Sequence, residues 1–187
     1  MKHIVRVSDF EYELHPEFIA QVPIEPRDAS KLLVLDRESG SLSHRMFSDL
    51  PQYMNPGDLL VLNNTLVVPA RLHGRKVTGG RIELLLLKRI SRQTWEVIVR
   101  GSGLHVDTRI LVDSESVDLT AAVVQKLEGP RRVVRFSQPV TPLLHKVGVV
   151  PLPPYIRTPL SDAKRYQTIF ASIPGSAAAP TAGMHFT

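Results

Sequence analysis

The chain has 187 residues, 43% of them hydrophobic and 22% charged, a balance typical of a folded globular protein rather than a disordered one. It has no cysteine, which excludes disulfides, thiolate zinc sites and a cysteine nucleophile and fits a reducing cytoplasm. Its longest apolar runs, residues 59–62 and 84–87, are far shorter than the roughly 20 residues of a membrane-spanning helix. We therefore expect a cytoplasmic protein without membrane contact.

The net charge of +5 is concentrated in the middle of the chain. Residues 71–135 contain 13 Lys or Arg against 7 Asp or Glu, a net +6, so the rest of the chain carries a net −1. A localised basic excess attracts polyanions such as nucleic acid, although many basic proteins bind none. Both interpretations stay open at this stage.

The first 66 residues mix short helical and strand signals. A short helix is expected from Pro16, and residues 31–36 and 41–47 form a predicted β-hairpin around Ser39-Gly40. Another helix start is expected at residues 48–51, and the apolar run 59–62 is predicted to be a buried strand. Arg27 and Asp28 follow a Pro-rich run, and we interpret them as a solvated ion pair.

Residues 67–137 are a succession of short strand-like segments separated by Gly breaks, a pattern typical of a small barrel or sandwich. In residues 94–101 the alternation places Trp95, Val97 and Val99 on one face. A turn of helix is expected at residues 143–147 and a longer helix from Ser161 through Phe170. These signals predict a first domain made of residues 1–66 and 138–187, interrupted by a β-domain at 67–137.

The last stretch, residues 166–187, combines a turn signal at residues 174–176 with small and polar residues typical of a site. It is equally typical of a tight turn leading into a helix capped by Thr187. His185 has the chemistry of a general acid or base, but a histidine buried and bonded to the backbone fits as well. No histidine pair has metal-ligand spacing, so we expect no metal.

Several motifs together resemble the N-terminal half of the S-adenosylmethionine:tRNA ribosyltransferase-isomerases, the family that acts in queuosine biosynthesis. The similarity extends over nearly the whole chain. The motifs that carry it are, in order, VSDFEYELHPEFIAQVPIEPRDASKLLVLDRESG, PGDLLVLNNT, NNTLVVPARL, PLPPYI, YQTIFA and GSAAAPTAGMHFT.

The resemblance implies an α/β domain, incomplete here, with an inserted small antiparallel β-barrel. It implies transfer and isomerisation of the ribosyl part of S-adenosylmethionine onto 7-aminomethyl-7-deazaguanine in tRNA, giving epoxyqueuosine, with S-adenosylmethionine as a consumed substrate and no cofactor. Such chemistry needs a base near the sulfonium, an acid at the departing adenine and cations for the tRNA backbone. The residues it implicates are His185 as catalytic residue, Thr181, Gly183, Phe186, Thr187, Asn63, Thr65 and Arg71 for substrate binding, and Arg75, Lys76 and Arg81 for nucleic acid.

Two departures from the family pattern stand out: Asn64 and Leu66 occupy positions where the family usually has an acidic and a basic residue, and residues 101–105 carry less positive charge. Family members are about twice as long, so we expect this chain to be a fragment that is inactive alone. The alternatives are a non-catalytic RNA-binding barrel and one half of a split enzyme completed by a separate C-terminal half.

Overall fold

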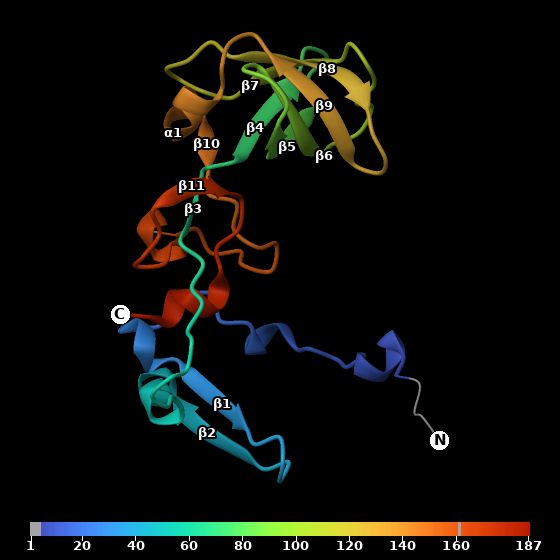
Figure 1. Ribbon diagram of the computed structural model, residues 1–187. Coiled ribbons are helices and arrows are strands. Elements are labelled where there is room, and N and C mark those ends of the chain that lie inside the picture. Colours follow the sequence, from blue (N-terminus) through green and yellow to red (C-terminus); the bar gives the residue numbers. More distant parts are fainter. Residues whose placement is uncertain (1–4, 161) are drawn as a thin grey trace.

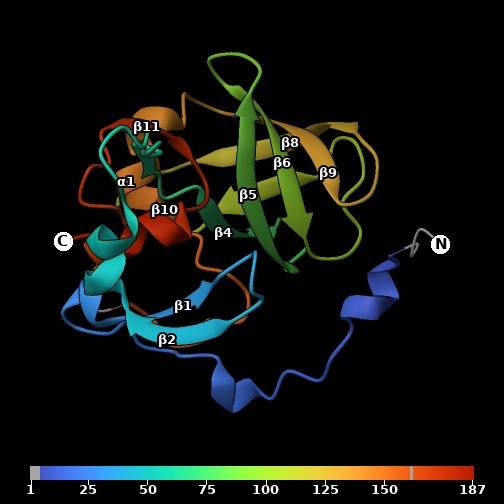
Figure 2. The same ribbon diagram turned by 60° about the horizontal axis from the view of Figure 1, so that its bottom comes forward.

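The computed structural model describes residues 5–160 and 162–187 and shows three parts stacked along one direction (Figure 1). A β-barrel lies at one end, a small sheet with short helical turns lies in the middle, and a β-hairpin lies at the other end. The described part of the N-terminal segment, from residue 5 onward, leads away from this stack, as a second view confirms (Figure 2). Within the described ranges, no helix is both long and apolar enough to cross a membrane.

The barrel is closed and entirely antiparallel. Its strands follow the order β4-β5-β6-β9-β8-β7, and pairing between β7 and β4 completes the ring. The bounds are β4 (Arg71–Lys76), β5 (Arg81–Arg89), β6 (Thr94–Arg100), β7 (Arg109–Val112), β8 (Thr120–Lys126) and β9 (Arg131–Phe136). The regular short strands allow a barrel or a sandwich, and the structure confirms the barrel that the family resemblance implies.

Alternation along the strands fills the barrel interior with apolar side chains. Val97 and Val99 are buried and Trp95 packs against the same core, as the sequence pattern predicts. At the closing seam, a Cβ on Gly74 would lie 2.5 Å from the carbonyl oxygen of Leu111. Closure of the ring therefore requires a residue without a side chain at this position.

The chain leaves the barrel through a 3-10 helix (Thr141–Leu143) and α1 (Leu144–Val147), confirming the predicted turn of helix. β10 (Gly148–Val149) then pairs antiparallel with the first residues of β4, Arg71 and Leu72. In the middle part, β3 (Thr65–Val67) and β11 (Ile173–Ser176) form a parallel pair. This parallel pairing and the short helices beside the barrel confirm the predicted fold class, whereas the exact domain boundaries stay a prediction.

The hairpin consists of β1 (Lys31–Leu35) and β2 (Leu42–Met46), as predicted. The remaining helical segments are all short 3-10 helices: Val7–Phe10, Pro16–Phe18, Arg27–Ala29, Phe47–Tyr53, Ala163–Tyr166 and Thr181–His185. The helix predicted to continue through Phe170 is therefore wrong beyond Tyr166, and its expected start at Ser161 lies outside the described residues.

The prediction of a buried strand at residues 59–62 is wrong. The segment forms no strand, and Leu59 and Val61 are 87% and 82% exposed. An apolar run becomes a buried strand only when a sheet edge pairs with it and other layers cover it. In the described structure this run has neither.

Candidate functional site

A cavity of about 600 Å³ lies where the C-terminal motif meets the chain before the hairpin and the Pro-rich segment after the barrel. His185 and Thr181 line it from the 3-10 helix Thr181–His185. Ser30 and Lys31 line it from the start of β1, and Tyr155 lines it from the Pro-rich segment. Small-molecule sites commonly have volumes of about 300–1,000 Å³ with mostly apolar walls and a few polar groups, so this cavity has the size of a ligand site.

Arg27 holds the C-terminal motif against the segment before the hairpin. Its guanidinium donates hydrogen bonds to the carbonyl oxygens of Gln167 at 2.7 Å, Met184 at 3.1 Å and Lys164 at 3.3 Å. The interpretation of Arg27 and Asp28 as a solvated ion pair is therefore wrong. The flat, five-donor guanidinium suits several carbonyls at once, which a point charge does not.

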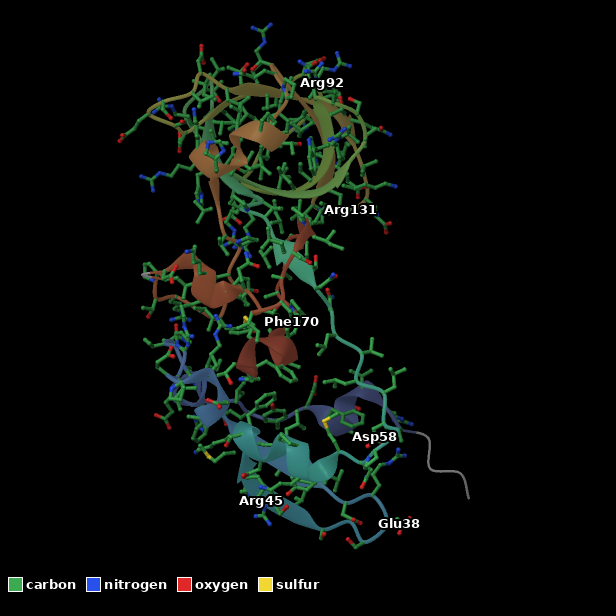
Figure 3. All side chains as sticks on the ribbon, turned by 60° about the vertical axis from the view of Figure 1, so that its left-hand side comes forward. Glu38, Arg45, Asp58, Arg92, Arg131 and Phe170 are labelled. Carbon is green, nitrogen blue, oxygen red and sulfur yellow. The ribbon has the colours of Figure 1, made fainter. Side chains whose placement is uncertain are left out.

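His185 lies between a hydroxyl and the aromatic ring of Phe47. Its Nδ1 is 2.8 Å from Oγ of Ser30, and its ring centroid is 5.3 Å from that of Phe47. Phe186 makes an edge contact with Phe47 at 5.0 Å and another with Phe170 at 5.9 Å. Phe170 lies in the middle part of the molecule, between barrel and hairpin (Figure 3). The contacts with Ser30 and Phe47 orient the imidazole at the cavity wall, and Phe186 connects Phe47 with Phe170 behind it.

The neighbours of His185 in the motif are also positioned by packing. A Cβ on Gly183 would lie 3.0 Å from Thr168 and 3.2 Å from Phe170, so the 3-10 helix approaches this surface closely because of the glycine. Thr187 follows the helix, and its hydroxyl is 3.5 Å from a carboxylate oxygen of Asp28. Five predicted site residues, Thr181, Gly183, His185, Phe186 and Thr187, therefore share this small region.

The other predicted substrate-binding residues lie elsewhere. Asn63 accepts a hydrogen bond from the backbone N–H of Thr65 at 2.9 Å, at the start of β3. Arg71 lies 3.2 Å from Glu83 on the neighbouring strand and donates to the carbonyl oxygen of Leu152 at 3.1 Å. None of Asn63, Thr65 and Arg71 lines the 600 Å³ cavity.

A second cavity, of about 620 Å³, lies between β3 and the segment that follows α1. Gln167 borders it and clasps β3: its amide nitrogen donates to the carbonyl of Val67 at 2.7 Å, and its amide oxygen accepts from the N–H of Val67 at 2.9 Å. Leu66 lines the same cavity and contributes to its apolar wall.

The predicted nucleic-acid residues lie on the barrel. Arg75 and Arg81 are directly opposite each other on β4 and β5, and both are exposed. Lys76 donates to the carbonyl oxygen of Ser102 at 3.1 Å. Among the residues that the structure describes, no group of three or more His, Asp or Glu side chains has the arrangement of a metal site.

Sequence reasoning missed three residues that shape the site: Arg27 as a clamp, Ser30 as the partner of His185, and Gln167 as the clasp on β3. Their partners lie 100 or more positions away in the chain. The placement of Arg27 just after a Pro-rich run was a weak signal that a loop residue had a specific role.

The fold and the site together define a protein in which a closed β-barrel is inserted next to a ligand-sized cavity built around a C-terminal histidine motif. A family model described as "Queuosine biosynthesis protein" matches residues 7–187. The chain therefore belongs to the queuosine biosynthesis protein family.

Curated relatives are similar over nearly the full length of this chain. The S-adenosylmethionine:tRNA ribosyltransferase-isomerase of Acetivibrio thermocellus is 50% identical over 187 residues, which is 98% of this chain and 54% of that protein. The enzyme of the same name from Thermotoga maritima is 46% identical over 184 residues, again 98% of this chain and 54% of that protein. The chain thus spans about half the length of the curated relatives it matches.

A crystal structure of an S-adenosylmethionine tRNA ribosyltransferase from Thermotoga maritima is 39% identical and covers 79% of this chain and 52% of that chain, with a TM-score of 0.39.

Proposed function

We propose that this chain carries the S-adenosylmethionine-binding part of a tRNA ribosyltransferase-isomerase, with the cavity beside His185 as the nucleoside site. The observation that carries the proposal is the coincidence of a 600 Å³ cavity with the C-terminal motif of a family whose curated relatives bear that activity in their names. The reaction consumes S-adenosylmethionine as a substrate, transfers its ribosyl part to 7-aminomethyl-7-deazaguanine in tRNA, and yields epoxyqueuosine; no separate cofactor takes part.

The polar groups of the cavity suit the charges of this substrate. Arg27 and Arg165 already donate to backbone carbonyls, whereas Lys31 makes no hydrogen bond or ion pair within the described residues. Lys31 is thus free to pair with the methionine carboxylate. His185, at the other polar patch of the wall, is the group placed to move a proton at the carbon beside the sulfonium.

Binding and turnover test this proposal separately. Isothermal titration of the purified chain with S-adenosylmethionine should show one site, weakened at least tenfold by Lys31→Gln. The matched control is Lys146→Gln, which removes the same charge from the exposed surface of α1 and should leave the affinity unchanged. Equal affinity for the two variants would place the substrate elsewhere.

Exposed apolar surface supports a polypeptide partner equivalent to the second half of the relatives. Within the described residues the β3–β11 pair has two strands only, although parallel sheets are normally buried on both faces, and Leu59 and Val61 in the segment before β3 are almost fully exposed. We propose that such a partner, continuous or separately encoded, completes the site. Adenine release from S-adenosylmethionine and precursor tRNA should require co-expression with the C-terminal half of the Acetivibrio thermocellus enzyme. Turnover by the 187-residue chain alone would refute this dependence.

The barrel supplies the proposed tRNA contact. Like charges directly opposite on a sheet repel, and Arg75 faces Arg81 in this way; Arg109 and Arg135 also lie on either side of Ala122 in one row. A phosphate between two such arginines would relieve the repulsion. Arg92 extends the cationic character to another part of the barrel (Figure 3), whereas Arg131 is paired with Glu96 at 3.2 Å.

Salt dependence tests the tRNA contact. In an anisotropy titration, Arg75→Gln combined with Arg81→Gln should reduce the slope of log affinity against log salt by roughly two, because each lost phosphate contact releases about one counterion fewer. The matched control, Arg37→Gln with Arg45→Gln, removes the same charge from the hairpin region at the opposite end of the molecule (Figure 3) and should leave the slope unchanged. Equal slopes in the two double variants would show that the barrel face makes no specific contribution.

A further inference from the structure

Two short contacts at Ser30 determine which nitrogen of His185 carries a proton. Ser30 follows the 3-10 helix Arg27–Ala29, and its Oγ is 2.7 Å from the carbonyl oxygen of Arg27. The same Oγ is 2.8 Å from Nδ1 of His185. One hydroxyl therefore faces a carbonyl oxygen and an imidazole nitrogen at hydrogen-bond distance.

A serine hydroxyl has a single hydrogen, and a carbonyl oxygen has none to give. The contact with Arg27 at 2.7 Å is a hydrogen bond only if Ser30 donates its hydrogen there. If the hydroxyl donated to His185 instead, two oxygens would lie 2.7 Å apart with no hydrogen between them, which is repulsive. The hydroxyl must then accept from the imidazole, so Nδ1 of His185 bears the proton and Nε2 of the neutral ring has the free lone pair.

The surroundings of the ring leave Nε2 available to a ligand. Within the described residues Nε2 has no hydrogen-bond partner, and it is not among the buried unpaired side-chain atoms, so it is accessible to solvent. The charged groups on the neighbouring elements have partners other than the imidazole. Arg27 donates to three carbonyls, Asp28 lies near Thr187, and Asp49 accepts from the backbone N–H of Met46. In the part of the chain that the structure describes, a neutral hydroxyl and no carboxylate orients this histidine.

We propose that Ser30 is a positioning residue that fixes His185 as the Nδ1–H tautomer and presents Nε2 to the cavity as a proton acceptor. The proton-transfer part rests on the proposed function; the tautomer does not. In that step the Nε2 lone pair takes a proton from the carbon next to the sulfonium, and the electron pair of the C–H bond stays on that carbon. The ring becomes an imidazolium with a proton on each nitrogen, and Ser30 continues to accept from Nδ1–H throughout.

The tautomer is measurable without any substrate. Long-range ¹H–¹⁵N spectra of the histidine-labelled chain, recorded where the imidazoles are neutral, should show the Nδ1–H pattern for His185. Ser30→Ala should shift His185 toward the Nε2–H form that free imidazole side chains prefer, and Ser30→Thr should restore the original pattern. His145 is exposed on α1 and serves as an internal control that does not change. An Nε2–H pattern in the unmodified chain would overturn the inference.

Activity gives a second, distinguishable readout in the co-expressed assay described above. Ser30→Ala should lower kcat about 10- to 100-fold with little change in KM, as expected for loss of a group that orients a functional histidine, and Ser30→Thr should recover most of it. Circular dichroism and the melting temperature of each variant separate this effect from misfolding. An unchanged kcat in Ser30→Ala refutes the positioning role. Failure of the unmodified chain to bind S-adenosylmethionine, with the Nδ1–H tautomer intact, instead refutes the proposed function.

Discussion

Arg27→Ala is predicted to release the C-terminal motif from the segment before the hairpin while leaving the barrel intact. The side chain connects this segment with three backbone carbonyls that lie 137 to 157 positions away, at Lys164, Gln167 and Met184. Met184 is next to His185, so the clamp also maintains the contact between His185 and Ser30. Its loss should therefore uncouple the two halves of the cavity wall.

The free energy that Arg27→Ala should cost follows from the three hydrogen bonds. Hydrogen bonds that involve a charged group contribute about 1.5–3 kcal/mol each, so three could contribute about 4.5–9 kcal/mol. The bond to Lys164 is long at 3.3 Å and exposed, and ordering an arginine side chain costs about 2 kcal/mol. A net loss of about 3 kcal/mol remains, which corresponds to a factor on the order of 100 in a local opening equilibrium.

Amide hydrogen exchange measures that opening directly. The N–H of Gly183 donates to the carbonyl of Pro180 at 2.8 Å and should exchange on the order of 100-fold faster in Arg27→Ala. Amides of Val97 and Val123 in the barrel should keep their protection, because the change does not touch that core. Arg37→Ala, an exposed change outside the clamp, is the control. Unchanged exchange at Gly183 would show that packing of the aromatic rings alone holds the motif.

Three further changes test the barrel and the hairpin. Gly74→Ala should destabilise the barrel by about 1–3 kcal/mol in urea unfolding, because its Cβ would meet a backbone carbonyl at 2.5 Å; an unchanged midpoint would show that the seam can widen. Phe136→Ala, at a side chain that is 2% exposed, should cost about 3–5 kcal/mol in the same assay, and a smaller loss would mean that the core collapses around the cavity. Hydrogen bonds from the backbone and hydroxyl of Ser39 lower the pKa of Asp36 from its usual 3.8, so the stability they give the hairpin is complete above that pH and is lost as the pH falls through the lowered pKa. Ser39→Ala should raise the pKa of Asp36 part of the way back in a ¹³C-detected carboxyl titration, and an unchanged pKa would assign the effect to the backbone donors alone.

The barrel strands could be predicted from the sequence because the pattern that marks them lies within each strand. Each strand alternates apolar and polar residues, and a closed ring buries one face of every strand in the same way. The faces predicted for Trp95, Val97 and Val99 are therefore confirmed without knowledge of strand order. The predicted hairpin is confirmed for the same reason, since its turn and both strands are contiguous.

The predictions that proved wrong concern features that depend on residues far away in the chain. The run at residues 59–62 has the composition of a buried strand, but composition does not supply the neighbouring strand, and the segment stays exposed. The role of Arg27 depends on backbone carbonyls, which carry no mark in the sequence. The roles proposed for His185 and the other site residues remain predictions, because position in a cavity does not by itself establish chemistry.

The unequal division of the core explains why the site is the adaptable part of the molecule. Among the described residues, eighteen buried ones form the core of the barrel and of the turns beside it, whereas the cluster next to the site has three, Val67, Tyr166 and Ala179. Apolar burial is the main source of stability, so it stabilises the barrel strongly and the site region only weakly. The hydrogen bonds of Arg27, Ser30 and Gln167 replace that missing core with contacts that open at a lower cost. Ligand or partner binding should consequently protect the amides of residues 163–187 far more than those of the barrel, since binding stabilises most strongly the region whose opening it prevents.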